Sequence, residues 1–122
     1  MLSCPRGLLR ERIAARTKAL FERGWIDEVE RLLAAGVSVV SPAMNSLGYR
    51  TIASALHGGM LSPSLIDDVV TEAQQYAKRQ ETFFRSERDA VWIDVSQEAW
   101  ESRAKELVSA FLRPEGGVGD AE

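Results

Sequence analysis

The segment 63–88 constrains the fold of this chain more than any other part of the sequence. Ser62 and Pro63 supply a helix cap and a first-turn proline for it. Its apolar positions, which fall within about a third of the helical wheel, are Leu65, Ile66, Val69, Ala73, Tyr76, Ala77, Phe83 and Phe84. We therefore expect one long amphipathic helix whose apolar face is buried. Gln80 lies in the middle of that face, where it needs hydrogen-bond partners.

The opposite side of the same helix carries a continuous polar stripe. Its members are Thr71, Gln74, Gln75, Lys78, Thr82 and Arg85, with Arg79 at the flank. This stripe is suited to a polar ligand, so the long helix is a candidate binding element.

Further segments with helical periodicity predict a mostly α fold of four to five helices. They are 7–23, 26–35, 43–57 and 97–112. Gly24 and Gly36 end the first two, which we expect to form a helical hairpin. Gly48 interrupts the third and lowers its helix propensity, which indicates a close approach of another group at that position.

Residues 91–95, Val-Trp-Ile-Asp-Val, predict one short C-terminal β-strand. A single strand leaves its backbone donors and acceptors unpaired. We therefore predict that it joins a sheet outside this chain, and that without this sheet it promotes self-association. The tail, residues 113–122, is rich in glycine and acids and is expected to be disordered.

Composition and sequence motifs exclude several classes of protein. The 122 residues are 45% hydrophobic and 27% charged, as in one ordinary domain or part of one. The single cysteine, Cys4, and the single histidine, His57, provide neither an internal disulfide nor a zinc site, and we assign neither a catalytic role. No apolar run approaches the ~20 residues that cross a bilayer, so we expect no membrane contact and a cytoplasmic location. Neither G-x-x-x-x-G-K-[ST] nor G-x-G-x-x-G occurs.

The charge is unevenly distributed along the chain. Its net value is −3, but residues 1–61 carry eight Lys or Arg and only five acids. Three basic groups stand out, at Arg12/Arg16/Arg23, at Gly48-Tyr49-Arg50 and at 78–85. Taken singly, each group is explained more simply by a solvated helix face, because charge stripes are common. From the residues alone, the chain is at most an anion-binding helical module.

Taken in order, five segments resemble the C-terminal part of tRNA dimethylallyltransferases, also called tRNA isopentenyltransferases. The segments are Leu2-Ser3-Cys4-Pro5-Arg6 leading to Leu9, Arg12-Ile13 and Arg16; Gly24 to Val29; Ser46-Leu47-Gly48-Tyr49-Arg50; Tyr76-Ala77-Lys78-Arg79-Gln80 with Thr82, Phe84 and Arg85; and Trp92-Ile93-Asp94. The similarity covers residues 2–96. Five segments in the family's order are far more specific than any one of them.

The resemblance implies an activity and an RNA substrate. Enzymes of this family transfer a dimethylallyl group from its diphosphate to the exocyclic amine of the adenosine beside the anticodon. They use magnesium and no organic cofactor. The matching segments imply contacts with the anticodon stem-loop from Asn45, Ser46, Leu47, Gly48, Tyr49, Arg50, Lys78, Arg79, Gln80, Thr82, Phe84 and Arg85.

Some of these residues also fit a structural role. Tyr49 and Phe84 fit the core as well as an RNA contact, and for Gln80 we expect a buried structural role that orients its neighbours. Arg12 and Arg16 face phosphate in the complete enzyme or pair with Glu11, Glu28 or Glu30, and pairing is the alternative that we favour.

Departures from the family pattern predict what the chain lacks. The family's P-loop, which grips the diphosphate and Mg²⁺, and its catalytic acid have no counterpart here, so we expect no catalytic residue, no metal site and no bound cofactor in this chain. Ala73-Gln74 replaces a Thr-Arg pair, and Glu81 adds a negative charge, so tRNA affinity is expected to be weakened. Strand 91–95 would join the sheet of the missing P-loop α/β domain.

We therefore interpret the chain as a C-terminal fragment of such a transferase that is inactive alone. Residues 1–88 form the predicted helical tRNA-contacting region, and residues 89–112 form a strand and helix of the core domain. Two alternatives stay open: a freestanding, non-catalytic RNA-binding module and a helical interaction module with merely solvated basic stripes.

Overall fold

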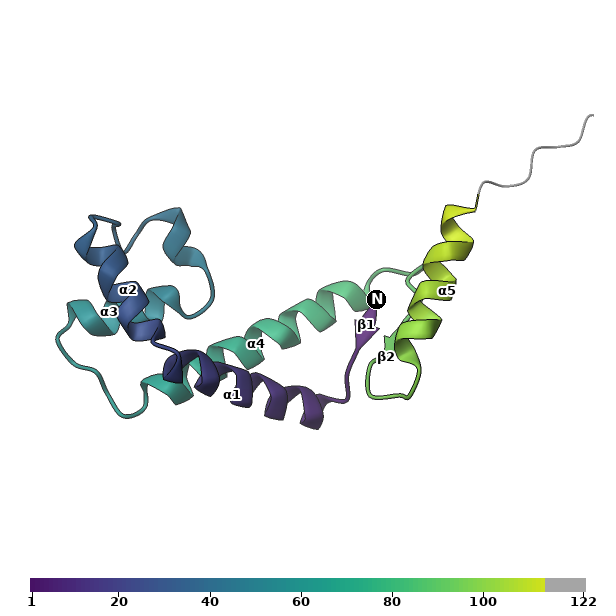
Figure 1. Cartoon of the computed structure of the whole chain (residues 1–122), viewed down its shortest axis with the longest axis horizontal. Coiled ribbons are helices and arrows are strands. Elements are labelled where there is room, and N and C mark those ends of the chain that lie inside the picture. The colour runs from purple at the N-terminus through teal and green to yellow at the C-terminus, as the bar shows by residue number, and fades with distance from the viewer. Residues whose placement is uncertain (114–122) are drawn as a thin grey trace, which may run out of the picture.

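The computed structural model describes residues 1–113 and is mostly helical in that range, as predicted (Figure 1). Its elements in chain order are β1 (Leu2–Ser3), α1 (Arg6–Glu22), α2 (Trp25–Ala34), the 3₁₀ helix η1 (Pro42–Asn45), α3 (Tyr49–His57), α4 (Leu65–Arg85), β2 (Ile93–Asp94) and α5 (Trp100–Leu112). No helix within this range is both long and apolar enough to cross a membrane. The predicted disordered tail lies outside the described residues except for Arg113.

The elements form three parts along the length of the molecule. The long helices α1 and α4 run side by side in opposite directions, and we call them the arm (Figure 1). At one end, α2, η1 and α3 pack together and against the arm, and we call them the head. At the other end lie β1, β2 and α5.

The hydrophobic core lies in the head and in the adjoining half of α4. Its fully buried members are Trp25, Val29, Met44, Ile52, Ala53, Leu65 and Val69. They come from α2, η1, α3 and α4, so burial of their apolar surface holds the head onto the arm. The predicted hairpin of α1 and α2 is formed across Gly24, whose positive φ of 94° allows α2 to begin immediately.

Gly48 divides the predicted third helix into two pieces, η1 and α3. Its φ is +84°, a left-handed conformation that a helix cannot continue through. The residue is buried against the ring of Trp25. A Cβ at this position would lie 2.8 Å from Cζ2 of Trp25, closer still to its Cη2, and 3.0 Å from Cγ1 of Val69. The predicted close approach at Gly48 is therefore confirmed, whereas the continuous helix 43–57 is wrong.

The predicted buried face of α4 is buried only in its first half. Leu65 and Val69 are in the core, but Tyr76 is 45% and Phe83 64% exposed. Gln80 is exposed too, and its amide donates a hydrogen bond to the Tyr76 hydroxyl at 3.1 Å. The prediction of a buried Gln80 is therefore wrong. The core of the head includes only Leu65 and Val69 of α4, and the α4 residues that line the pocket against α1 do not include Tyr76, Gln80 or Phe83.

The strand that was expected to lack a partner has one within this chain. β2 pairs in parallel with β1, with Leu2 opposite Ile93 and Ser3 opposite Asp94. The amide of Ile93 donates to the carbonyl of Met1, and that of Val95 to the carbonyl of Ser3, both at 2.9 Å. Leu2–Ser3 is too short to show strand periodicity, which is why the sequence did not predict this pairing.

Candidate functional site

The predicted site residues lie in two places on the structure. Residues 45–50 form the end of η1, the turn at Gly48 and the start of α3, all in the head. Residues 78–85 lie on the second half of α4. At the helical rise of 1.5 Å per residue, Arg79 lies about 10 Å along α4 from Glu72, which contacts the head. One group therefore lies in the head and the other on the arm, and they do not form one compact cluster.

Glu72 of α4 connects the arm to the head through hydrogen bonds to Gly48 and Thr51. Its Oε2 accepts a hydrogen bond from the Thr51 hydroxyl at 2.7 Å, and its Oε1 accepts one from the Gly48 amide at 3.4 Å. Both bonds are partly buried, which strengthens them relative to exposed bonds. Glu72 is not predicted as a site residue from the sequence, because nothing in its spacing links it to Thr51, 21 positions away.

Tyr49 is half-buried and held by other residues of the head. Its hydroxyl donates to Oε1 of Glu28 at 2.9 Å, and its ring meets that of Trp25 edge-on at 5.4 Å. Burial raises the pKa of the Tyr49 hydroxyl above its usual value, and the Glu28 carboxylate raises it further. Beside it, the exposed guanidinium of Arg50 donates to Oδ1 of Asn45. Arg50 is thus the cation that this group presents to solvent.

The second half of α4 presents two different faces. Successive helical residues turn by about 100°, so Tyr76, Arg79 and Phe83 follow Glu72 on the side that contacts α3. We call Tyr76, Arg79, Gln80 and Phe83 the aromatic face. The Arg79 guanidinium lies 5.9 Å from the centroid of the Tyr76 ring, and the exposed ring of Phe83 meets that of Phe84 edge-on at 5.2 Å. This face combines an exposed cation with exposed aromatic rings.

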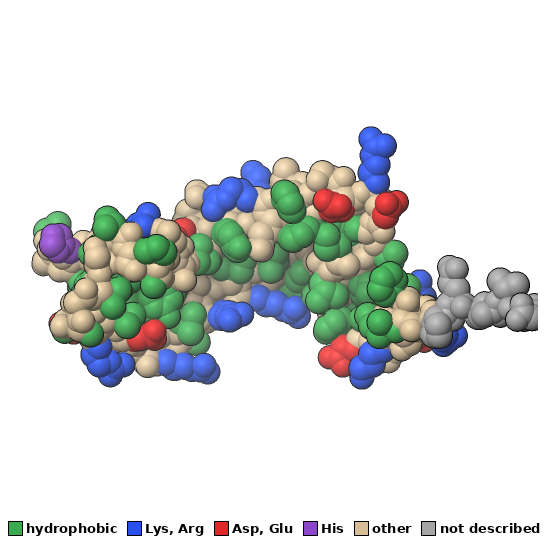
Figure 2. Space-filling view, turned by 90° about the horizontal axis from the view of Figure 1, so that it is seen from above, with side chains coloured by type: hydrophobic (Ala, Val, Ile, Leu, Met, Phe, Trp, Pro, Cys, Tyr) green, Lys and Arg blue, Asp and Glu red, His purple; other side chains and the backbone are tan. Residues whose placement is uncertain are grey.

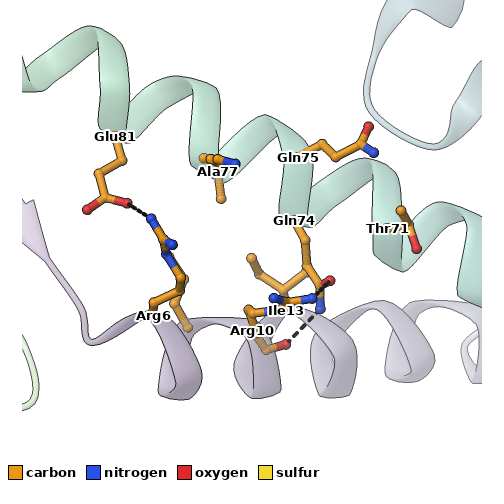
Figure 3. A pocket seen from close by; sticks show the side chains of 10 residues that line it. Arg6, Arg10, Ile13, Thr71, Gln74, Gln75, Ala77 and Glu81 are labelled. Carbon is orange, nitrogen blue, oxygen red and sulfur yellow. Dashed lines mark hydrogen bonds and ion pairs between the residues drawn. The ribbon is translucent and has the colours of Figure 1, made fainter.

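The other face of α4 lines a cavity of about 250 Å³ against α1, which we call the arm pocket (Figure 3). Leu9, Ile13 and Ala77 give it an apolar lining, and the cationic side chains at it are Arg6, Arg10 and Lys78. Gln74 closes one part of it, exchanging two hydrogen bonds of 3.4 Å with Arg10. Thr71, Gln74, Gln75 and Lys78 of the predicted polar stripe thus lie on the side of α4 that faces α1.

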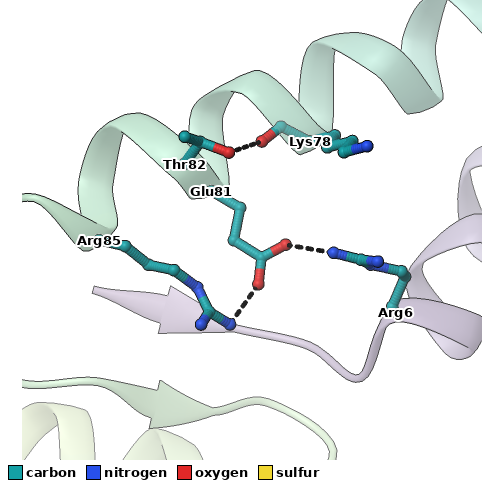
Figure 4. Close-up of polar contacts among 5 residues, drawn as sticks. All are labelled: Arg6, Lys78, Glu81, Thr82 and Arg85. Carbon is teal, nitrogen blue, oxygen red and sulfur yellow. Dashed lines mark hydrogen bonds and ion pairs between the residues drawn. The ribbon is translucent and has the colours of Figure 1, made fainter.

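Glu81 pairs with two arginines at the end of the arm pocket (Figure 4). Its Oε1 lies 2.6 Å from Nη2 of Arg85, and its Oε2 lies 4.0 Å from Nη2 of Arg6. The hydroxyl of Thr82, the residue after Glu81, donates to the backbone carbonyl of Lys78, one turn earlier in α4, at 3.0 Å. Lys78 and Arg85 are thus separated from Arg79, which lies on the aromatic face.

The cations are arranged differently from the sequence prediction. Arg12 and Arg16 form no ion pair with Glu11, Glu28 or Glu30, so the expected pairing is wrong for these described residues. Arg6 and Arg10, which the site prediction left out, line the arm pocket. Their spacing of four residues, which places both on one face of α1, was the available signal. Figure 2 shows Lys and Arg side chains along both long edges of the arm, with apolar side chains between them.

Metal-ligating side chains are not brought together in the described part of the chain. No three His, Cys, Asp or Glu residues within 1–113 are grouped as a metal site would require. His57 ends α3 and is exposed, and the thiol of Cys4 is free and half-buried.

The family model and the relatives that this chain matches all point to the same enzyme family. Residues 1–87 match the family model described as IPP transferase. The tRNA dimethylallyltransferase of Thermomicrobium roseum is 37% identical over 119 residues, covering 98% of this chain and 36% of the relative. That of Synechococcus elongatus is 34% identical over 108 residues, covering 88% and 35%. The chain thus spans about a third of the length of the curated relatives it matches.

Solved structures show the same fold. The tRNA isopentenylpyrophosphate transferase of Bacillus halodurans superposes with a TM-score of 0.79 at 27% identity, over 90% of this chain and 36% of that one. The Staphylococcus epidermidis tRNA delta(2)-isopentenylpyrophosphate transferase gives the same TM-score and coverage at 23% identity, which supports the fold alone. Because the family model matches residues 1–87, well over half of the sequence, the chain belongs to the IPP transferase family.

Proposed function

We propose that this chain is the tRNA-contacting segment of a tRNA dimethylallyltransferase. Such an enzyme transfers a dimethylallyl group from dimethylallyl diphosphate to the adenosine next to the anticodon, in the cytoplasm. The observation that carries the proposal is the match of residues 1–87 to the IPP transferase model, together with relatives named tRNA dimethylallyltransferase.

Residues 45–50 of the head and the aromatic face of α4 together form what we call the α3-facing side. Its geometry supports contacts with an anticodon stem-loop. Arg50 in the head and Arg79 on α4 offer guanidinium groups that suit phosphate oxygens. Tyr76 and Phe83 are exposed rings of the kind on which unpaired bases stack. A loop of RNA has both exposed phosphates and unstacked bases, which matches this combination.

We further propose that the transfer chemistry depends on residues outside this chain. No three His, Cys, Asp or Glu residues are grouped within residues 1–113, and the sequence has no P-loop motif to hold a diphosphate. In this proposal a P-loop domain supplies the site for both the metal and the diphosphate, and its sheet continues the parallel pair of β1 and β2. Parallel strands are rarely stable as a pair alone, which favours such an extension.

The isolated chain should therefore have no transferase activity. We expect incubation of the purified 122-residue chain with dimethylallyl diphosphate, Mg²⁺ and tRNA to leave the RNA unmodified. Mass spectrometry of the digested nucleosides measures the product, and a longer relative from the same family serves as the positive control. Formation of dimethylallyl-adenosine by the chain alone would show that it contains a complete active site.

RNA binding tests the contacts directly. We expect the chain to bind an anticodon stem-loop hairpin with an affinity that falls as salt rises, and the Arg79→Ala variant to bind more weakly. Loss of one phosphate contact reduces the log–log salt slope by roughly 0.7–0.9. Fluorescence anisotropy at several salt concentrations measures the slope. Arg103→Ala on α5, which removes one exposed cation at the other end of the molecule, should leave the slope unchanged.

The outcomes separate the proposal from a helical interaction module. Such a module binds no RNA hairpin even at low salt. Binding that is equal in the wild type and in both variants would instead place the RNA on a different surface from the α3-facing side.

A further inference from the structure

Glu81 is positioned like a ligand of the arginines around it. Guanidinium groups from two different helices converge on its carboxylate, with Arg85 of α4 at 2.6 Å and Arg6 of α1 at 4.0 Å (Figure 4). The side chain of Glu81 is 36% exposed, whereas those of Arg6 and Arg85 are 70% and 71% exposed. The carboxylate thus lies inward of the two cations, which keep most of their surface in solvent.

We propose that Glu81 is an internal counter-ion occupying a phosphate site formed by Arg6 and Arg85, and that RNA must displace its carboxylate to bind there. The inference rests on the proposed function, because the phosphate belongs to the same RNA, which in this proposal contacts Arg50 and Arg79 and also reaches Arg6 and Arg85 at the end of the arm pocket. The guanidinium group presents a planar fork of donors that fits a carboxylate and a phosphate equally well. The same donors that hold Glu81 are therefore the ones that a backbone phosphate would use.

The exchange is favourable because the internal ion pair is weak and because the incoming RNA carries many phosphates, each with the same single charge as a carboxylate. Ion pairs between exposed side chains contribute little to stability, since water solvates both partners. A nucleic acid brings several phosphates at once, and counterions are released when they are neutralised. Glu81 then lowers the affinity of the site without closing it, and makes binding depend on how many phosphates the ligand carries.

A purely structural role for Glu81 makes a different prediction. If its carboxylate only bridges α1 and α4, then Glu81→Gln loosens the arm and weakens or leaves unchanged the binding of RNA. If it competes with phosphate, the same variant binds RNA more tightly, because two cations lose their internal partner while the fold is retained. The two roles therefore predict effects of opposite sign on affinity.

The experiment measures binding of an anticodon stem-loop hairpin to the full chain and to Glu81→Gln by fluorescence anisotropy at low and moderate salt. We expect Glu81→Gln to bind about two- to fivefold more tightly at low salt, with the gain shrinking as salt screens the charges. Asp67→Asn is the matched control, since it removes the same charge from the first turn of the same helix. It lies about 20 Å away along α4, which is beyond the Debye length of about 8–10 Å at moderate salt, so it should have no effect there and a smaller effect than Glu81→Gln at low salt.

A second variant shows whether the gain operates through the arginines. In an Arg6→Ala/Arg85→Ala background, Glu81→Gln should no longer raise the affinity, because no freed cation remains. A wild-type chain that binds the hairpin while Glu81→Gln binds equally or more weakly would overturn the counter-ion role alone. A gain that persists without both arginines would overturn it too. Absence of binding by both the wild type and Glu81→Gln would overturn the RNA-binding proposal and this inference with it.

Discussion

Gly48→Ala is expected to lower the free energy of unfolding by about 2–5 kcal/mol. Two independent effects add at this position. An alanine at φ +84° has a left-handed backbone that costs roughly 1–2 kcal/mol. Its Cβ also enters the van der Waals space of the Trp25 ring and of Val69, and overpacking of this kind costs about 1–3 kcal/mol. Urea unfolding followed by tryptophan fluorescence measures the loss, which is large for a domain whose total stability is about 5–15 kcal/mol.

Gly36→Ala separates the two effects. Gly36 has a φ of +90°, close to that of Gly48, but no heavy atom outside Gly36 and its two chain neighbours lies within 4 Å of the position of its Cβ. Its substitution should therefore show the backbone effect alone, about 1–2 kcal/mol. Equal losses at Gly36 and Gly48 would mean that the Trp25 contact contributes nothing and that the head relaxes around an added methyl group.

Met44→Ala is expected to remove about 2–5 kcal/mol of stability, the range found when large apolar side chains are deleted from a core. Met44 is 1% exposed and is the residue by which η1 joins the core of the head. Its loss leaves a cavity between η1 and α3, and it loosens the backbone that carries Asn45 and Gly48. Urea unfolding of the purified variant measures the change.

Met60→Ala is the matched control for the same deletion at the surface. Met60 lies between α3 and α4 and is 77% exposed, so its truncation should change stability by less than about 0.5 kcal/mol. A loss for Met44→Ala as small as that for Met60→Ala would show that Met44 does not hold η1 in the core.

Local signals predicted the helices well. The hairpin of α1 and α2, the position of α4 and the close approach at Gly48 all depend on residues near one another in sequence, such as Gly24 and the apolar repeat of Leu65 and Val69. The resemblance of the sequence segments to a known family is confirmed in the same way, because residues 1–87 match its model.

Contacts between distant residues were not predictable in this way. The partner of β2 is a two-residue strand at the other end of the sequence, which has no periodicity of its own. Periodicity identified an apolar face on α4 but not where the head stops covering it, so Tyr76, Gln80 and Phe83 were placed in the core. The cationic stripe was assigned to Arg12 and Arg16, although Arg6 and Arg10 are the residues that face α4.

The head and the paired strands lie at opposite ends of the arm, so a small rotation of the arm about the strands would move the head by a larger distance. The 21 residues of α4 extend about 30 Å at 1.5 Å per residue, with the head at one end and the paired strands near the other. Because β1 and β2 lie side by side, the chain leaves this sheet and returns to it at adjacent points. A tilt of about 10° at that base would carry the head through about 5 Å, given the length of the helix. A substitution in Met1–Ser3 or Val91–Val95 that produced such a tilt would displace Arg50 without touching any residue of the head.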